Sequence, residues 1–386
     1  MKTIINKVKG SGAGLSILSS GIAVLAGLLI GLIILLITDH TQAFPAFQTI
    51  ITVGFSSIRN FGELLYSATP IILTGLSVGF AMKTGLFNIG ASGQFTFGAY
   101  VAVLIGVRAE FIPPSIRLIV SVLAAILVGA LWGAIPGFLK AFRNVHEVIS
   151  CIMTNWIGIF LVNFMILNTI FDETRNSTMR VPGDANMPGW GLGELFQGAN
   201  ARPSSVNSGI VVAIAVAIII FIILGYTKFG YELKACGFNQ NAAKYAGISE
   251  KRNVVLSMMI SGGLAGLGGG LHFLSGAGIT MNVTDTLSYE GFTGISVALL
   301  GMNNPIGIIF AGLLIAYLQQ GGFQVQHFGF VPEIIEIVTA VIIYFCAFAL
   351  LIKSFFSRVG RKRADVVAEV EQVKELPKIE EEGSDK

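Results

Sequence analysis

Long apolar runs separated by short polar segments dominate the pattern of the chain. A helix needs about 20 mostly apolar residues to cross a hydrocarbon core of ~30 Å, because its backbone polar groups must be satisfied within the segment. By this measure the pattern predicts an all-α fold, a polytopic transmembrane helical bundle of about ten spans. The third and eighth spans are rich in glycine, so we expect broken or partly re-entrant helices there. The expected spans are residues 15–38, 62–82, 87–107, 116–139, 147–170, 208–226, 253–275, 290–302, 304–320 and 331–352.

Composition agrees with a membrane protein. Of 386 residues, 53% are hydrophobic and 12% are charged, whereas soluble domains carry roughly 25% charged residues. The first apolar run has about 24 residues, longer than the apolar part of a secretory signal, so we expect an uncleaved first helix. Cys151, Cys236 and Cys346 are too widely spaced to suggest a metal or disulfide framework. We therefore expect neither a metal nor a cofactor.

The distribution of lysine and arginine predicts the orientation, because cytoplasmic loops of membrane proteins carry more of both. With the N-terminus inside, an even number of spans places every lysine, and most of the 25 basic residues, in the cytoplasm. We therefore expect ten spans with both termini cytoplasmic, and leave nine and eleven open. The transmembrane domain is expected over residues 1–356. Residues 357–386 form a basic and then acidic cytoplasmic tail, whose composition is typical of a disordered segment.

Glycine recurs at every fourth position of two expected spans. In lipid, helices gain little from burying apolar surface against each other, so close backbone contact through small residues favours their association. We therefore expect both glycine ladders to lie at interfaces between helices. The ladders consist of Gly129, Gly133 and Gly137, and of Gly262, Gly266 and Gly270.

Two connections are too polar to cross a membrane. Residues 171–207 are expected outside the cell, where they could receive a partner or cover a transport pathway. Residues 231–252 are expected in the cytoplasm and are rich in alanine. There Asn239 can cap a short helix that Gly247 ends. From the residues alone, a linker helix and a docking helix for a soluble partner explain this segment equally well.

The cytoplasmic segment carries a pattern of small and polar residues: Glu232, Ala235, Gly237, Asn239, Ala242, Ala243, Ala246 and Gly247. This pattern resembles the coupling segment of ATP-binding-cassette importer permeases, and the resemblance implies that these residues contact the ATPase. It is closest to the permeases for branched-chain amino acids, simple sugars and nucleosides. The block Gly85-Leu86-Phe87-Asn88-Ile89-Gly90, followed by Gly93-Gln94, is most similar to the nucleoside permeases, which often carry Glu where this chain has Ser92. Residues 145–156 resemble the same group.

The resemblance implies a mechanism with several subunits. This permease would pair with a second permease subunit, two cytoplasmic ATP-binding subunits would dock on the coupling segments, and an extracytoplasmic substrate-binding protein would deliver the solute. The chain contains no G-x-x-x-x-G-K-[ST] phosphate loop, so ATP hydrolysis is expected on a separate subunit. We therefore expect a transporter rather than an enzyme, with no role for nucleic acid.

Four polar residues within or beside apolar spans are candidates for the substrate pathway: Asn88, Gln94, Glu147 and Asn155. Polar groups at such positions tend to face the bundle interior or a cavity. Asparagine and glutamine offer both donors and acceptors to an uncharged polar solute. The alternative, slightly favoured for each residue alone, is that they join neighbouring helices by hydrogen bonds.

Other functions predict other features. Within the same class, the solute could be a simple sugar or a branched-chain amino acid instead of a nucleoside. A secondary transporter that runs on an ion gradient would carry carboxylates at mid-depth and an inverted repeat. Here the acidic residues lie mostly near the ends of the spans, and no clear repeat is visible. A structural or assembly protein would leave the coupling-like segment unexplained.

Overall fold

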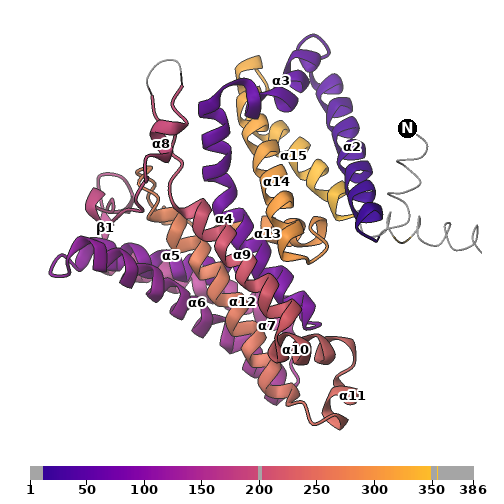
Figure 1. Ribbon diagram of the computed structural model, residues 1–386. Coiled ribbons are helices and arrows are strands. Elements are labelled where there is room, and N and C mark those ends of the chain that lie inside the picture. The colour runs from indigo at the N-terminus through magenta and orange to yellow at the C-terminus, as the bar shows by residue number, and fades with distance from the viewer. Residues whose placement is uncertain (1–11, 199–201, 349–353, 355–386) are drawn as a thin grey trace, which may run out of the picture.

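The computed structural model describes residues 12–198, 202–348 and 354, and helices make up most of them (Figure 1). All ten expected spans contain a helix, although α5 begins only at Ala91, after a non-helical stretch over residues 84–90. An additional helix, α3 (Ala43–Ser56), occupies a connection for which the sequence predicted no element. The ten helices are α2 (Gly12–Thr38), α4 (Ile58–Lys83), α5 (Ala91–Arg108), α6 (Pro114–Arg143), α7 (Glu147–Thr169), α9 (Gly209–Tyr226), α12 (Glu250–Phe273), α13 (Tyr289–Leu300), α14 (Pro305–Val325) and α15 (Pro332–Ala347).

Seven helices among the described residues are long and apolar enough to cross a membrane. They are α2, α4, α6, α7, α9, α12 and α14. Three expected spans fall outside this set. Helix α5 carries the polar residues Ser, Gln and Thr in its first turns. Helix α13 has 12 residues, and α15 has 16 described residues, so both are short. The structure thus confirms an all-α polytopic bundle. Seven of the ten expected spans are helices long and apolar enough to cross a membrane.

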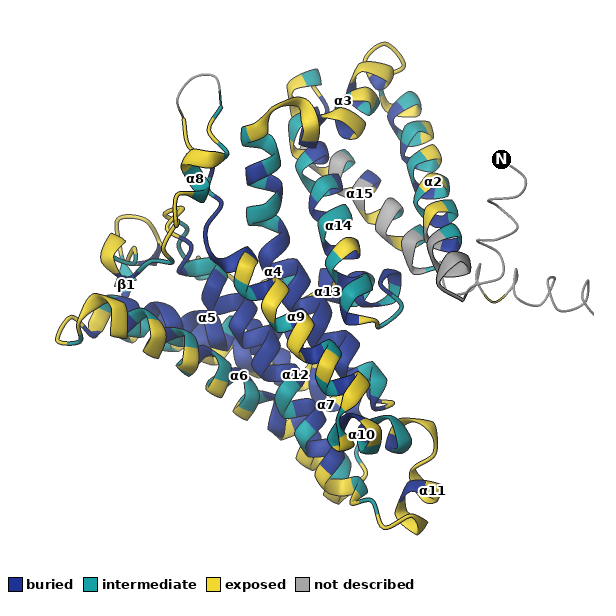
Figure 2. Ribbon diagram, in the orientation of Figure 1, coloured by how far each residue is buried: buried dark blue, intermediate teal, exposed yellow. Residues whose placement is uncertain are grey.

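Helices α4 and α12 form the centre of the molecule. Their apolar windows are 83% buried, whereas those of α2 and α6 are 22% and 28% buried. Figure 2 shows buried residues concentrated along α4, α5 and α12, with exposed residues on the outward side of α6. On the other side of the bundle, α2 packs against α15 and α3 packs against α14. The helices with the most polar and glycine-rich sequences therefore lie inside, and the most apolar helices lie outside.

The two glycine ladders pack directly against each other. A Cβ added at Gly129 would lie 2.9 Å from the Cα of Gly266, and one added at Gly133 would lie 3.1 Å from the Cα of Gly262. The expectation of close packing is confirmed, because α6 and α12 approach through their backbones. The opposite face of α6 is large and apolar. Its exposed residues include Leu123, Leu127, Leu131 and Ile135.

The connection over residues 171–207 lies at one end of the bundle, and residues 228–245 lie at the opposite end (Figure 1). It contains a two-stranded antiparallel ribbon of β1 (Phe171–Asp172) and β2 (Ser177–Thr178) and the short helix α8 (Leu192–Leu195). Its 3₁₀ turn η1 (Gly183–Ala185) is held on α6 by an ion pair between the buried Arg117 and Asp184, 2.5 Å apart. The expected tail, residues 357–386, lies outside the described residues.

The α6–α12 contact predicts a steric test. Gly129→Val should lower the free energy of unfolding by about 1–3 kcal/mol, the usual cost of inserting methyl groups into a closely packed interface. Gly225→Val is the matched control, because no atom lies within 4 Å of a Cβ added there. Melting of the detergent-solubilised protein measures the difference. Equal melting temperatures for the two variants would show that the close approach does not stabilise the bundle.

Candidate functional site

Two short helices extend the bundle between α9 and α12. They are α10 (Lys228–Phe238) and α11 (Gln240–Tyr245). Thr227 caps α10 by accepting a hydrogen bond from the backbone N–H of Gly230 at 3.0 Å. Asn239 caps α11 in the same way, with its Oδ1 3.0 Å from the backbone nitrogen of Ala242. Gly247 follows α11 with a left-handed φ of 78°, a conformation that glycine adopts without strain. The predicted cap and stop of this helix are both confirmed.

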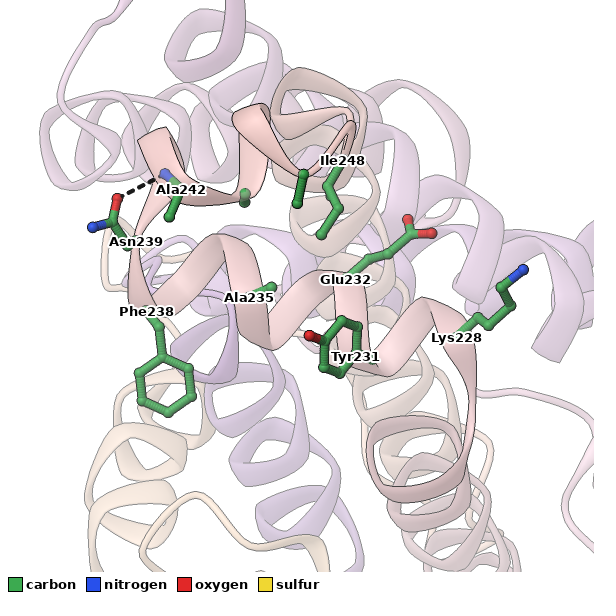
Figure 3. A pocket seen from close by; sticks show the side chains of 10 residues that line it. Lys228, Tyr231, Glu232, Ala235, Phe238, Asn239, Ala242 and Ile248 are labelled. Atoms are coloured by element: carbon green, nitrogen blue, oxygen red, sulfur yellow. Dashed lines mark hydrogen bonds between the residues drawn. The ribbon is translucent and has the colours of Figure 1, made fainter.

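A groove of about 440 Å³ runs between α10 and α11. Figure 3 shows the side chains of Glu232, Ala235 and Ala242 directed towards it. Alanines give it smooth walls, and two large aromatic residues stand at its edge, Tyr231 with 68% and Phe238 with 91% of its surface exposed. Exposed aromatic residues in a polar segment are typical of a surface that a partner covers.

The structure divides the predicted coupling residues into two sets. Six of them line the groove: Glu232, Ala235, Asn239, Ala242, Ala243 and Ala246. Gly247 ends α11 without facing it. Gly237 points instead towards the turn after α4, where an added Cβ would lie 2.8 Å from the carbonyl oxygen of Lys83 and 2.9 Å from the nitrogen of Gly85. The sequence missed the aromatic edge, whose signal was the presence of Tyr231 and Phe238 in an otherwise polar stretch.

Helix α10 is attached firmly to the bundle. Leu233 is fully buried and belongs to the main hydrophobic core. Cys236 is also buried and accepts a hydrogen bond from Asn253 Nδ2 of α12 at 3.6 Å. Together with the contact of Gly237 at the turn after α4, these contacts join α10 to both central helices. A displacement of α10 would therefore press on α4 and α12.

Three of the four predicted pathway residues meet in one buried network. Asn88 Nδ2 donates to Gln94 Oε1 at 2.8 Å and to Ser261 Oγ of α12 at 2.7 Å. Asn155 of α7 accepts a hydrogen bond from the backbone N–H of Gly93 at 2.9 Å and donates to the carbonyl of Ile89 at 3.0 Å. The bonds of Asn155 pair one backbone carbonyl of the non-helical stretch before α5 and one backbone N–H in the first turn of α5. The geometry therefore agrees with the interpretation that these residues join helices.

Glu147 lies apart from this network. It forms an ion pair with Lys140 at 2.9 Å, which joins the end of α6 to the start of α7. The spacing of Glu147, Cys151 and Asn155 places all three on one face of α7. Ser261, the partner of Asn88, and Ser77, which bonds in turn to Ser261, were not predicted. Serine in a glycine-rich helix is too common to single them out from sequence.

No cluster of three or more His, Cys, Asp or Glu side chains suited to a metal occurs among the described residues. The candidate site consists of the groove between α10 and α11 and of the buried polar network around Asn88.

Residues 60–347 match the protein family described as the permease component of the branched-chain amino acid transport system. The chain belongs to this permease family. It is therefore a multi-pass protein of the cell membrane and a component of transport systems rather than an enzyme. No solved structure matches the chain.

Two similar proteins are named as nucleoside transport permeases. The nucleoside ABC transporter permease protein NupB of Lactococcus lactis is 38% identical over 86% of this chain and 91% of its own length. The guanosine ABC transporter permease protein NupP of Bacillus subtilis is 36% identical over 89% of this chain and 97% of its own length. The glucose ABC transporter permease protein TsgB13 of Haloferax volcanii is 31% identical over 87% of each chain.

The buried network predicts a loss of stability on truncation. Asn88→Ala should lower the free energy of unfolding by about 1–3 kcal/mol, because it leaves buried polar partners unpaired. Asn168→Ala is the control, since this exposed side chain bonds only within its own helix. Melting and solute uptake are measured together. Unchanged melting with lost uptake would refute the joining role and support direct contact with the solute.

Proposed function

We propose that this chain is the membrane-spanning subunit of an ATP-driven importer of nucleosides. The similarity to two permeases named for nucleosides or guanosine, over nearly the whole of both chains, carries the proposal. The groove between α10 and α11 supports it, because an importer without its own ATPase needs a surface on which one can dock. In this proposal ATP is hydrolysed on two separate subunits, a second permease completes the pathway, and an extracytoplasmic binding protein delivers the solute.

The proposed topology has ten spans over residues 1–356 and cytoplasmic termini. Helices α5, α13 and α15 would complete the count while being shielded from lipid by their neighbours. Buried surfaces of α5 and α13 support this, because their residues Gly98 and Gly294 contact the central helices α12 and α4. With this topology α10 and α11 face the cytoplasm, and residues 171–207 face outward.

In the proposed coupling step, closure of the ATPases moves α10 and α11 as one unit. The contact of Gly237 with Gly85 supports a direct route into the bundle, because the non-helical stretch that carries Asn88 begins at this turn. Asn88, Gln94 and Asn155 then hold the start of α5 beside the solute pathway. Glu147 keeps the α6–α7 connection rigid through Lys140.

A simple sugar is the second candidate solute, because the glucose permease of Haloferax volcanii is also similar along most of its length. Uptake of labelled guanosine and glucose into vesicles that hold the complete transporter separates the two. The nucleoside proposal requires guanosine uptake that depends on ATP and survives an ionophore. Uptake that stops with the ion gradient, and needs no ATPase, would establish a secondary transporter instead.

The topology predicts which residues an impermeant thiol reagent can reach. Asn241→Cys in α11 should react only in inside-out vesicles, and Glu194→Cys in α8 only in intact cells. Both positions are exposed, and the native Cys151 and Cys236 are buried. Both variants carry Cys346→Ser, so that the third native thiol cannot react. Labelling of Asn241→Cys from outside would place the groove on the wrong side of the membrane and end the coupling proposal.

Filling the groove should separate coupling from folding. Ala242→Trp places an indole in the groove and should reduce nucleoside uptake at least tenfold. A tenfold loss corresponds to about 1.4 kcal/mol of docking free energy, which blocking a close-packed interface commonly removes. Gln240→Trp adds the same bulk on the same helix at an exposed position that does not line the groove. Both variants should reach the membrane in normal amounts. Equal uptake by the two would exclude the groove as the docking surface.

A further inference from the structure

A second cavity, of about 370 Å³, lies on the far side of the buried network from α10. Its walls come from α5, from α7, from the end of α12, and from the connection over residues 279–288 with the start of α13 that follows it. Phe95 and Thr96 of α5 line it directly after Gln94 of the network. The volume falls within the range of roughly 300–1,000 Å³ that small-molecule sites occupy.

Hydrogen bonds hold the outer wall of this cavity in place. Ser92 Oγ donates to the carbonyl oxygen of Ser288 at 3.0 Å, and Asn163 Nδ2 donates to that of Thr284 at 2.9 Å. The backbone N–H of Met281 donates to Thr178 Oγ1 at 3.1 Å, which ties the same connection to β2. The wall is therefore bonded to α5, to α7 and to the outer ribbon. A cavity fixed in this way is formed before any solute arrives.

The lining combines flat aromatic rings with hydroxyl groups and one carboxylate. Phe273 and Tyr289 supply the accessible rings, alongside the buried Phe95, and Thr96 and Thr280 supply hydroxyls. Among the described residues that line the cavity, Glu290 is the only one with a formal charge. Rings suit the faces of a planar heterocycle, and hydroxyls suit the edges of a sugar. The cavity thus offers complementary groups to both halves of a nucleoside.

Glu290 lines this cavity from the first turn of α13 and is half-buried. The neighbouring Gly291 packs on Ser92, where an added Cβ would lie 2.7 Å from the serine Cβ. Ser288 Oγ donates to Glu290 Oε2 at 2.7 Å and so orients the carboxylate. A carboxylate has about four acceptor positions, so further hydrogen bonds can be accepted there.

We propose that this cavity binds the nucleoside during transport, and that Glu290 accepts hydrogen bonds from adjacent N–H groups of a guanine-type base. The inference rests on the proposed function, and it adds where the nucleoside binds and which base is preferred. Guanine presents a ring N–H beside an amino group, and two carboxylate oxygens match such a pair. Adenine presents an amino group beside a ring acceptor, so it can donate to the carboxylate from one position only. The site therefore favours guanosine over adenosine.

The test measures occupation of the cavity in the full-length chain in membrane vesicles. Asn282→Cys places a thiol at an exposed lining position, and its rate of alkylation is followed with guanosine or adenosine added. We expect guanosine to slow alkylation at a lower concentration than adenosine. Adding Glu290→Gln should raise the half-protecting guanosine concentration at least tenfold, since hydrogen bonds to charged groups contribute about 1.5–3 kcal/mol and 1.4 kcal/mol is tenfold. The half-protecting adenosine concentration should change less than about threefold.

Glu110→Gln on the same background is the matched control, because Glu110 is exposed and lines a different pocket. An unchanged alkylation rate without nucleoside shows that the Glu290→Gln variant keeps its fold. Nucleoside uptake by the complete transporter is measured separately. If uptake occurs but guanosine gives no protection, or protects the Glu290→Gln variant equally well, this inference is wrong while the proposed function stands. If no nucleoside is taken up, both are wrong.

Discussion

The close approach of the α6 and α12 backbones is the contact on which the rest of the bundle depends. In lipid the hydrophobic effect does little to bring two helices together, so their association depends on van der Waals contact and hydrogen bonds. Glycines on both helices permit that contact, with Gly129 facing Gly266 and Gly133 facing Gly262. The same requirement explains the distribution of side chains, because α6 keeps its small residues inside and directs its leucines outward.

A bundle packed through backbones leaves little room for polar groups that lack partners. The network around Asn88 supplies such partners in the non-helical stretch between α4 and α5, residues 84–90. There the side chain of Asn88 bonds to those of Gln94 and Ser261. The amide of Asn155 bonds to backbone groups of Ile89 and Gly93 that a continuous helix would have paired otherwise. This network separates the groove between α10 and α11 from the cavity that contains Glu290.

The contact between Gly237 and Gly85 gives the groove a physical connection to that network. Both residues lack side chains at the point where α10 meets the turn after α4, so backbone touches backbone. A rigid contact of this kind transmits displacement with little loss, whereas a flexible side chain would absorb part of it. In the segment over residues 231–252, Gly237 is therefore explained by packing, Gly247 by its left-handed backbone, and the alanines by the shape of the groove.

The sequence alone determined the class of fold, the positions of the ten helices to within a few residues, the glycine interfaces and the cap of α11. These features depend on local composition and periodicity, which are visible along the chain. It did not determine the helix α3, the number of helices apolar enough to cross, or the role of each polar residue. Those depend on which side chains meet. Asn88 and Ser261 are far apart in sequence, so only the tertiary structure decided that they bond to each other. Glu290 lines a cavity built from four segments, so its surroundings too are visible only in the folded molecule.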